Sequence, residues 1–405
     1  MTITEQLQIF KRGTSQILNE EEFVERLQTG KPLKVKLGVD PTAAHVTLGW
    51  AVVFRKLRDF QKLGHTACLV IGTFTAQIGD PSGKNKTRPP LSAEEVQKYT
   101  ASVLDQVYKI LDPEKTKIYY NSDWLSKMSF QEVIKLASHC TVARMLERDD
   151  FAKRLAEEKP VALHEILYPL CQAYDSVQME PDIELGGQDQ LFNHLLGRTL
   201  MGHYHQKPQM VMLCPLLIGL DGKEKMSQSL GNYIGITEAP NEMYGKTMSI
   251  PDHLILSWLE LATDVPVDDI KSYEKGMQEG KINPMEVKRR LAKELVTLYH
   301  SQAVADQAEA FFTQTFSQRQ QPQDAEYVFI PEELLKEERI SLAGLITAIG
   351  ITKSNSQARR LIESGAVCLD AQKIIEPKVS FSKNELVDKV LRAGRHRFCR
   401  LKIKT

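Results

Sequence analysis

A short stretch near the start of the chain combines a polar turn with the start of a helix. Residues 33–49 read LKVKLGVDPTAAHVTLG, in which an apolar run typical of a buried strand stops at Asp40. Apolar residues then recur at helical spacing from Leu48 onward, and Thr47 is placed to cap the helix. A helix start offers unpaired backbone N–H groups, which attract anions. The spacing therefore predicts a phosphate site here, although most strand-to-helix turns of an α/β fold bind nothing.

A second stretch carries cations far downstream. Residues 221–233 read DGKEKMSQSLGNY and bring Lys223 and Lys225 together with glycines and serines. By itself such a run is usually a solvated loop. Two further polar runs lie between these stretches, GDPSGK at 79–84 and GGQDQ at 186–190. The layout places all three runs at the ends of expected strands, where parallel α/β sheets bind nucleotides.

Together these runs resemble the signatures of class I aminoacyl-tRNA synthetases. DPTxxxxxLG early in the chain and KMSxS late in it form the class pattern, and GDPSGK with GGQDQ is similar to the bacterial tyrosine enzymes. The resemblance covers essentially the whole chain. It implies that L-tyrosine is activated by ATP to tyrosyl-adenylate and then transferred to tRNA(Tyr). It also implies ATP with Mg2+ as substrate, no tightly bound cofactor, no metal site, and a homodimer.

The expected tyrosine pocket centres on a carboxylate in an apolar helix. Asp175 lies within the run LYPLCQAYDSV, where burial of a charge is costly unless it is satisfied. The alternative is a structural helix with one polar face. By resemblance, Asp175 takes the phenolic hydroxyl, and rejection of the analogue without a hydroxyl by roughly ten-thousand-fold or more is a property for which this family is the standard example. The expected tyrosine-binding residues are Lys36, Asp40, Thr75, Asp80, Asn121, Tyr168, Gln172, Asp175 and Gln190.

Within that set, the resemblance gives two residues a special meaning. Asp40 is expected to meet the substrate ammonium, together with the Tyr168, Gln172 and Asp80 group. Lys36 stands where one branch of the family has a tyrosine near the substrate ring, which places this chain in the other branch.

ATP is expected on the other side of the reacting centre. Activation is an in-line attack of a carboxylate on the α-phosphate, and it needs cations and N–H donors where charge develops on the leaving pyrophosphate. By resemblance, the catalytic residues are Thr42, Thr47, Lys84, Arg88, Lys225 and Gln228. The expected ATP-binding residues are His45, Gly49, Trp50, Gly187, Asp189, Met226 and Ser227.

The chain departs from the family pattern at the catalytic signatures. The His-Ile-Gly-His signature falls on residues 47–50, so Thr47 and Trp50 replace both histidines, and Gln228 replaces the second lysine of KMSKS. Loss of one preorganised donor costs roughly 3 kcal/mol of transition-state stabilisation. Two alternatives therefore stay open: a weakened paralogue that binds tyrosine or RNA and regulates, and an enzyme for another phenolic amino acid outside translation.

Composition sets outer limits on the function. The chain has 405 residues, of which 42% are hydrophobic and 26% charged, as in ordinary soluble proteins. No apolar run is long enough for a membrane span, and the N-terminus does not read as a signal peptide, so we expect a cytoplasmic protein. Six scattered cysteines without a CxxC pair indicate reduced thiols.

Charge is distributed unevenly along the chain. The totals of 52 basic and 52 acidic residues balance, but from residue 340 onward there are thirteen Lys or Arg against five Asp or Glu. This segment resembles a small RNA-binding module, and its cations are expected to form one phosphate-contacting face, with a solvated basic surface as the alternative. The expected RNA-binding residues are Lys353, Arg359, Arg360, Arg395, Arg397, Arg400 and Lys402.

Strands and helices that alternate along the first half must position these residues. Helical residues 1–32, with a capping box from Asn19 to Glu22, precede buried strands at 33–39, 67–72, 117–122 and 210–220, which indicates an α/β fold with a parallel sheet. We expect a Rossmann-like catalytic domain at 1–234, a helical anticodon-arm-binding domain at 235–320, a linker at 321–338 and a small α+β RNA-binding module at 339–405.

Overall fold

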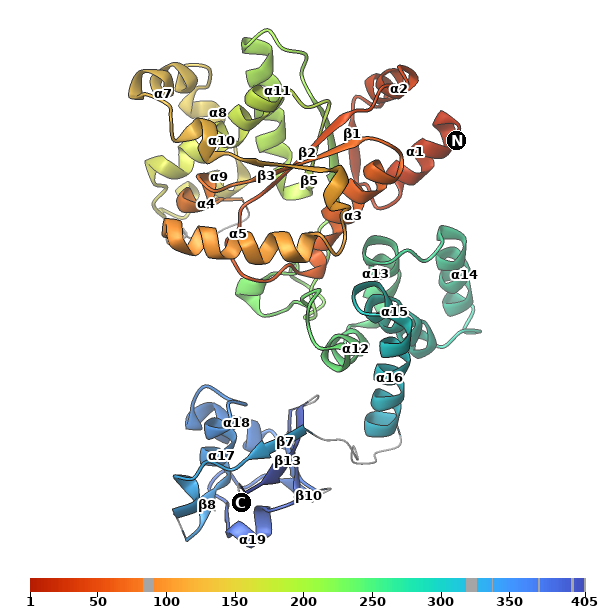
Figure 1. Cartoon of the computed structure of the whole chain (residues 1–405), viewed down its shortest axis with the longest axis vertical. Helices are drawn as coiled ribbons and strands as arrows, with labels where there is room; N and C mark the ends of the chain where they lie inside the picture. The colour runs from red at the N-terminus through yellow and green to blue at the C-terminus, as the bar shows by residue number, and fades with distance from the viewer. Residues whose placement is uncertain (83–90, 318–325, 337, 371, 395–396, 404–405) are drawn as a thin grey trace. The chain divides into compact units, whose positions relative to one another are not determined.

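The computed structural model describes residues 1–82, 91–317, 326–336, 338–370, 372–394 and 397–403. These residues form two compact units (Figure 1). Unit 1 comprises residues 1–238 and 246–299, and unit 2 comprises residues 239–245 and 300–405. Residues 246–299 group with unit 1, because the helix Ile255–Ala262 packs on the helix Leu48–Lys62, and the predicted domain boundaries stay a prediction.

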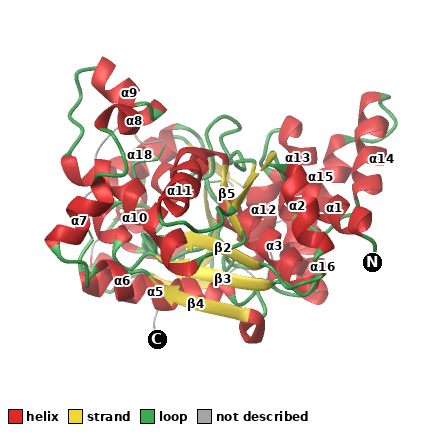
Figure 2. Cartoon of the chain, turned by 90° about the horizontal axis from the view of Figure 1, so that it is seen from above, coloured by secondary structure: helices red, strands yellow, loops and turns green. Residues whose placement is uncertain are grey.

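A six-stranded sheet forms the centre of unit 1, in the order β1-β6-β5-β2-β3-β4. All its pairings are parallel except that of β1 with β6. Figure 2 shows β2, β3 and β4 side by side. The predicted parallel α/β sheet is therefore confirmed. Its strands are β1 (Gln16–Leu18), β2 (Lys34–Val39), β3 (Thr66–Ile71), β4 (Thr116–Tyr120), β5 (Ile183–Gly187) and β6 (Met210–Cys214).

Helices cover both faces of this sheet, with α10 and α11 on one side and α3 and α5 on the other (Figure 1). The predicted cap of α3 is confirmed, since Thr47 Oγ1 accepts from Trp50 N, and Ser92 forms a capping box with Glu95 at the start of α5. Helices α1 to α11 are α1 (Ile3–Lys11), α2 (Glu20–Gln28), α3 (Leu48–Lys62), α4 (Thr75–Ile78), α5 (Ala93–Val107), α6 (Ser122–Leu125), α7 (Phe130–Ala137), α8 (Val142–Leu146), α9 (Asp149–Ala156), α10 (Leu163–Met179) and α11 (Leu191–His203).

The N-terminal segment differs from the prediction. It is not helical throughout, because β1 interrupts it and pairs antiparallel with β6. Asn19 adopts a left-handed backbone conformation with φ of 61°, and its side chain does not cap α2. The open edge of β6 offers unpaired backbone groups, and covering them outweighs the local helical tendency of residues 16–18.

Helices dominate residues 240–312, as predicted. In unit 1, Arg55 and Arg58 of α3 both pair with Asp264, at 2.6 Å each, and Trp258 Nε1 donates to the carbonyl of Ile218 at 3.0 Å. These contacts tie α13 and the turn after it to the sheet domain. The helices of this region are α12 (Pro240–Met248), α13 (Ile255–Ala262), α14 (Val267–Gln278), α15 (Pro284–Tyr299) and α16 (Gln302–Phe312).

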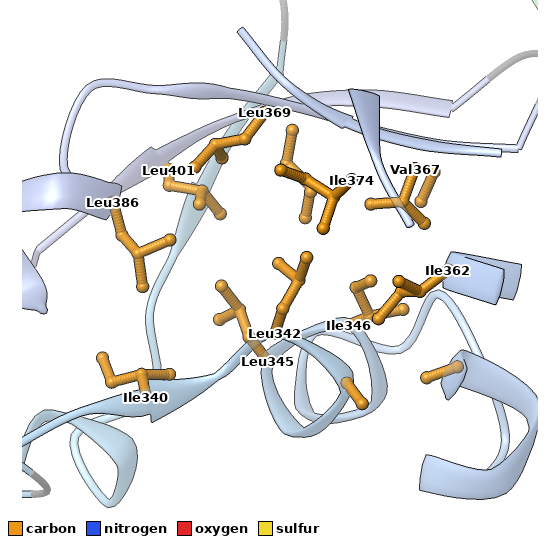
Figure 3. Close-up of a cluster of buried hydrophobic side chains, with 14 of the residues drawn as sticks. Ile340, Leu342, Leu345, Ile346, Ile362, Val367, Leu369, Ile374, Leu386 and Leu401 are labelled. Atoms are coloured by element: carbon orange, nitrogen blue, oxygen red, sulfur yellow. The ribbon is translucent and has the colours of Figure 1, made fainter. Parts of the chain in front are cut away.

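The C-terminal part of unit 2 is a small α+β module, as predicted. Its five-stranded sheet, in the order β10-β9-β12-β13-β7, packs on α17 and α18 around a core that includes Leu342, Leu345, Leu391 and Leu401 (Figure 3). Its elements are β7 (Glu326–Phe329), β8 (Ile340–Ser341), α17 (Leu342–Ala348), α18 (Asn355–Glu363), β9 (Val367–Leu369), β10 (Gln372–Ile374), β11 (Ser380–Phe381), α19 (Lys383–Leu386), β12 (Val390–Ala393) and β13 (Arg397–Lys402).

One strand of this module lies in the predicted linker. β7 pairs in parallel with β13, with Glu326 opposite Cys399 and Phe329 opposite Lys402. The prediction of a linker is therefore wrong for residues 326–329. This four-residue strand was not predicted, because the residues around it are polar. An edge strand that pairs through its backbone needs little apolar surface of its own.

Candidate active site

The candidate site lies where the chain reverses its winding direction across the sheet. β2 stands between β3 and β5, and successive strands extend outward from it on both sides. In such sheets, ligands bind beyond the carboxyl ends of the strands at this switch point. A pocket of about 790 Å³ opens there, and Asp40 follows directly on β2. The predicted residues that line it are Asp40, Thr42, Thr47, Gly49, Trp50, Thr75, Asp80, Asn121, Tyr168, Gln172, Asp175, Gly187, Asp189, Gln190, Lys225, Met226, Ser227 and Gln228.

Of the other four predicted residues, the structure places two outside this lining. Lys36 is fully buried and pairs with Glu184 at 2.8 Å, so its ammonium does not face the pocket directly. His45 is exposed, and its backbone carbonyl accepts a hydrogen bond from the Gln228 side chain. The remaining two, Lys84 and Arg88, lie outside the described residues.

The Asp175 carboxylate is the most buried acidic group of the pocket lining. Trp124 Nε1 donates to Oδ1 at 2.9 Å, and Asn121 Nδ2 lies 3.4 Å from Oδ2. Burial raises the pKa of Asp175 to about 7, against the opposing effects of Lys36, Trp124 and Asn121. Sequence reasoning missed Trp124, because a single aromatic residue on the four-residue helix α6 carries no pattern that marks a ligand.

A chain of hydrogen bonds fixes Asp40 at the end of β2. Tyr168 Oη donates to Oδ2 at 2.9 Å, Thr75 Oγ1 donates to Oδ1 at 2.7 Å, and Asn121 Nδ2 donates to Thr75 Oγ1 at 2.9 Å. Burial and the nearby carboxylates raise the pKa of Tyr168, so its hydroxyl stays a donor at neutral pH. A Cβ at Gly72 would lie 1.9 Å from Asp40 Oδ1, so only glycine leaves room for this carboxylate.

A second polar network positions Gln172, Asp80 and Gln190. Gln190 Nε2 donates to Asp80 Oδ2 at 3.0 Å, while Asn193 Nδ2 donates to the amide oxygens of Gln172 at 2.8 Å and Gln190 at 3.0 Å. Arg148 donates to Asn193 Oδ1 at 2.6 Å and holds that amide in turn. Sequence reasoning missed Asn193 and Arg148, since neither lies in a motif and only the fold brings them together.

On the opposite side of the pocket, the Lys225 ammonium and the Gly49 N–H group are both paired with other groups of the chain. Lys225 Nζ lies 2.6 Å from Asp189 Oδ2, and Gly49 N donates to Met226 Sδ at 3.2 Å. The Trp50 side chain lines the same pocket. The loop at residues 225–229 therefore contacts the start of α3 through the side chain of Met226.

The predicted RNA-binding cations divide between two faces of the C-terminal module. Leu401 of β13 points into the core against α17, so its neighbours Arg400 and Lys402 point to the opposite face of the sheet. The side of the helices carries the others: Lys353, Arg359 and Arg360 are exposed there, and Arg397 donates to the carbonyl of Ile351 at 3.3 Å. The prediction of a single face is therefore wrong, because strand alternation was not considered. Arg395 lies outside the described residues.

The described residues contain neither a membrane span nor a cluster of metal-binding side chains. No helix in these ranges is long and apolar enough to cross a membrane. Among the same residues, no three His, Cys, Asp or Glu side chains gather in a group that could hold a metal ion.

Two families match the sequence. Residues 28–317 match the tRNA synthetases class I (W and Y), and residues 325–401 match the tyrosine–tRNA ligase SYY-like C-terminal domain. The chain is 48% identical over 403 residues to the tyrosine–tRNA ligase of Moorella thermoacetica, covering 98% of this chain and 96% of that protein. It is 52% identical to the one from Carboxydothermus hydrogenoformans, over 91% of each chain.

Solved structures share the fold of the larger part. The tyrosyl-tRNA synthetase of Archaeoglobus fulgidus complexed with L-tyrosine has a TM-score of 0.64 at 23% identity, covering 76% of this chain and 100% of that one. A truncated mitochondrial tyrosyl-tRNA synthetase of Aspergillus nidulans gives 0.64 at 22% identity, covering 78% of this chain and 94% of that one.

Replacement of Asp175 by Asn should change how stability depends on pH. With a folded-state pKa of about 7 against an ordinary 3.8, the native state binds a proton that the unfolded state has released between these values. This contribution to the unfolding free energy therefore falls as pH rises to 7 and is constant above it. From about pH 5.5 to about pH 7, wild type should lose about 2 kcal/mol relative to Asp175→Asn.

Urea unfolding followed by tryptophan fluorescence measures this difference, because Trp50, Trp124 and Trp258 all belong to unit 1. Asp264→Asn serves as the control. Arg58 and Arg55 outweigh partial burial and hold the pKa of Asp264 at about 2, so its loss should cost the same throughout this pH range. A pH-independent difference for Asp175→Asn would show that the buried carboxyl is ionised throughout.

Proposed function

The chain belongs to the class I tRNA synthetases and, within them, to the tyrosine–tRNA ligases; on that premise we propose that it joins L-tyrosine to tRNA(Tyr) at the pocket beyond β2. The observation that carries the tyrosine assignment is Asp175. An ionised carboxylate has about four acceptor sites, and the contacts with Trp124 and Asn121 leave room for one more donor. A phenolic hydroxyl at the bottom of the pocket supplies that donor.

The amino end of tyrosine has matching partners nearer the sheet edge. Asp40, Asp80 and the amide oxygens of Gln172 and Gln190 offer acceptors to an ammonium group, and Tyr168 holds Asp40 in place. A buried site built around these polar groups penalises any ligand that leaves them without partners. Phenylalanine would leave Asp175 without the phenolic donor, and discrimination against it follows.

In the first chemical step, a tyrosine carboxylate oxygen attacks the α-phosphorus of ATP. A P–O bond forms, the bond from the α-phosphorus to the bridging oxygen of the β-phosphate breaks, and pyrophosphate leaves with the electron pair. Then a ribose hydroxyl of the terminal nucleotide of tRNA attacks the tyrosyl carbonyl, loses its proton and releases AMP. We assign the developing phosphate charge to Lys225, Thr42, Thr47 and Gln228, and to Lys84 and Arg88 outside the described residues.

Nucleotide binding then requires an exchange of partners. ATP ribose hydroxyls take Asp189 and its phosphates take Lys225, which replaces the present 2.6 Å ion pair. The glycine at 187 allows a close approach, since even a Cβ there would lie 2.8 Å from Asp189 Oδ1. Gly49, Met226, Ser227 and Trp50 complete the nucleotide side, with Mg2+ accompanying ATP as substrate.

Tyrosine-dependent exchange of labelled pyrophosphate into ATP tests this function directly. We expect exchange with tyrosine and none with phenylalanine, and loss of tyrosine-dependent exchange in Asp175→Ala. The double variant Thr47→His with Gln228→Lys restores the family signature residues and should raise the exchange rate by about a hundredfold. No exchange by wild type, with tyrosine still bound and activity only in the double variant, would contradict a ligase and leave a binding paralogue.

The C-terminal module is proposed to hold tRNA through its helix side. Lys402 on the sheet side is already paired with Asp388 at 2.5 Å, and Arg400 donates to the backbone carbonyl of the same residue at 3.1 Å. Arg359 and Arg360 are exposed on α18, where phosphates can approach. The helices between residues 240 and 312 are proposed to contact the anticodon arm.

Removal of the two α18 arginines should weaken tRNA binding and its salt dependence. Each lost phosphate contact lowers the slope of log K against log salt by about 1, so Arg359→Ala with Arg360→Ala should lower it by about 2. Filter binding of tRNA at several salt concentrations measures this slope. Arg400→Ala with Lys402→Ala removes the same charge from the other face and should change the slope less; equal effects would contradict a helix-side site.

A homodimer is proposed through the segment between β4 and β5. Phe130 and Ile134 lie one helical turn apart on α7 and are 80% and 55% exposed, while Val142 and Leu163 are 65% and 74% exposed. Exposed apolar surface of this kind marks protein contact sites. We place the assembly in the cytoplasm.

Sedimentation equilibrium tests the dimer. Wild type should sediment at twice the 45.9 kDa chain mass, and Phe130→Asp with Ile134→Asp should sediment near the chain mass because charges are costly inside an apolar interface. As a control, the Lys271→Asp change on the exposed α14 should leave the mass unchanged. A monomeric wild type would contradict this assembly.

A further inference from the structure

A buried polar network lies beneath the floor of the tyrosine pocket. Lys36 Nζ of β2 donates to Ser176 Oγ at 2.7 Å, to Glu184 Oε1 of β5 at 2.8 Å and to the backbone carbonyl of Gln172 at 3.3 Å. Gln209 Nε2 donates to the other Glu184 oxygen at 2.8 Å. Lys36 is fully buried and Glu184 is 2% exposed. Charges at this depth persist only when they are paired and hydrogen-bonded, as these are.

This network holds the part of α10 that carries Asp175 and Gln172, which are expected to bind tyrosine. Gln172 and Ser176 flank Asp175, so one lysine from the neighbouring strand holds both sides of the turn that presents the carboxylate. Ser176 Oγ also lies 3.3 Å from Glu184 Oε2, which ties the same turn to β5. A displacement of α10 along the sheet would break several buried hydrogen bonds at once, each costly to leave unmade.

We propose that Lys36 and Glu184 are positioning residues that together fix Asp175 against the sheet, place two opposite charges beneath it and thereby set the affinity for tyrosine. Lys36 touches neither tyrosine nor ATP in this arrangement and acts through Asp175. The proposal rests on the tyrosine-binding role of the pocket and names the charges that tune it. It also accounts for a lysine at a position where one branch of the family has a tyrosine.

Lys36 and Glu184 carry opposite charges, so loss of one should shift the pKa of Asp175 in the opposite direction to loss of the other. Burial raises the pKa of Asp175, Lys36 is the strongest influence that lowers it, and Glu184 raises it. Burial lowers the pKa of His194, which lies beside Glu184, and Glu184 opposes this shift. The ionised carboxylate accepts a stronger, charge-assisted hydrogen bond from the phenol, so tyrosine affinity should rise with pH through about 7. The titratable and charged groups around Asp175 are Lys36, Asp40, Asp80, Tyr168, Cys171, Glu184 and His194.

Calorimetric titration of L-tyrosine between about pH 5.5 and about pH 8.5 tests the proposal. In Lys36→Met the midpoint of the affinity profile should move up by about one pH unit or more, and in Glu184→Gln it should move down. A purely structural pair would weaken tyrosine binding in both variants without moving the midpoints apart. Identical midpoints in the two variants would overturn the proposal.

Lys34→Met is the matched control. Lys34 lies two residues earlier on the same strand, and its Nζ donates to the carbonyl of Met179 at the end of the same helix at 2.6 Å, yet it does not act on Asp175. Its loss should leave the midpoint unchanged, and a shift equal to that of Lys36→Met would also overturn the proposal.

Two further outcomes are distinguishable. A single variant can fail to fold, because an unpaired buried charge costs about 3 to 5 kcal/mol. The double variant Lys36→Met with Glu184→Gln removes both charges. The midpoint of its affinity profile should lie above that of wild type and below that of Lys36→Met alone. An unchanged or lower midpoint would overturn the proposal. No tyrosine binding by wild type at any pH would instead contradict the proposed function.

Discussion

The cost of burying the Asp175 carboxylate governs the architecture around the pocket. Asp175 is 4% exposed, so the protein itself must supply most of its donors and a compensating charge. Asn121 directly follows β4 and Trp124 lies on α6 just after it, the charge of Lys36 comes from β2, and Asp175 itself lies on α10. Three segments far apart in the sequence thus contact or act on this one side chain. The remaining acceptor capacity is what the pocket offers to a ligand.

On the proposed nucleotide side of the pocket, polar groups of the chain pair with one another. Lys225 and Asp189 neutralise each other, and Met226 occupies the N–H donor at the start of α3. The Gln228 side chain, in place of a cation, binds the carbonyl of His45 and braces the loop. At the proposed ATP site, the nucleotide would therefore exchange partners with these groups. The free energy gained on binding is the difference between the two sets.

Periodicity predicted the sheet and the cap at Thr47, because these features are local, and the resemblance to the synthetase family supplied most of the predicted residues that line the pocket. Trp124, Asn193 and Arg148 could not be predicted, since they act through contacts with distant segments. β1 and β7 were missed because edge pairing, not composition, makes them strands. The basic residues of the C-terminal module were grouped wrongly because charge counting ignores the face to which each side chain points.

The parallel pairing of β7 with β13 brings the first and last strands of the C-terminal module together. Glu326 lies opposite Cys399, and the paired stretch ends with Phe329 opposite Lys402, so the two ends of the module are separated along the strands by about 10 Å, the length of one short strand. Domains with neighbouring ends transfer between chains without opening their own cores. The module is therefore portable. Its addition to a chain or its removal as one piece would leave its own core of buried side chains intact.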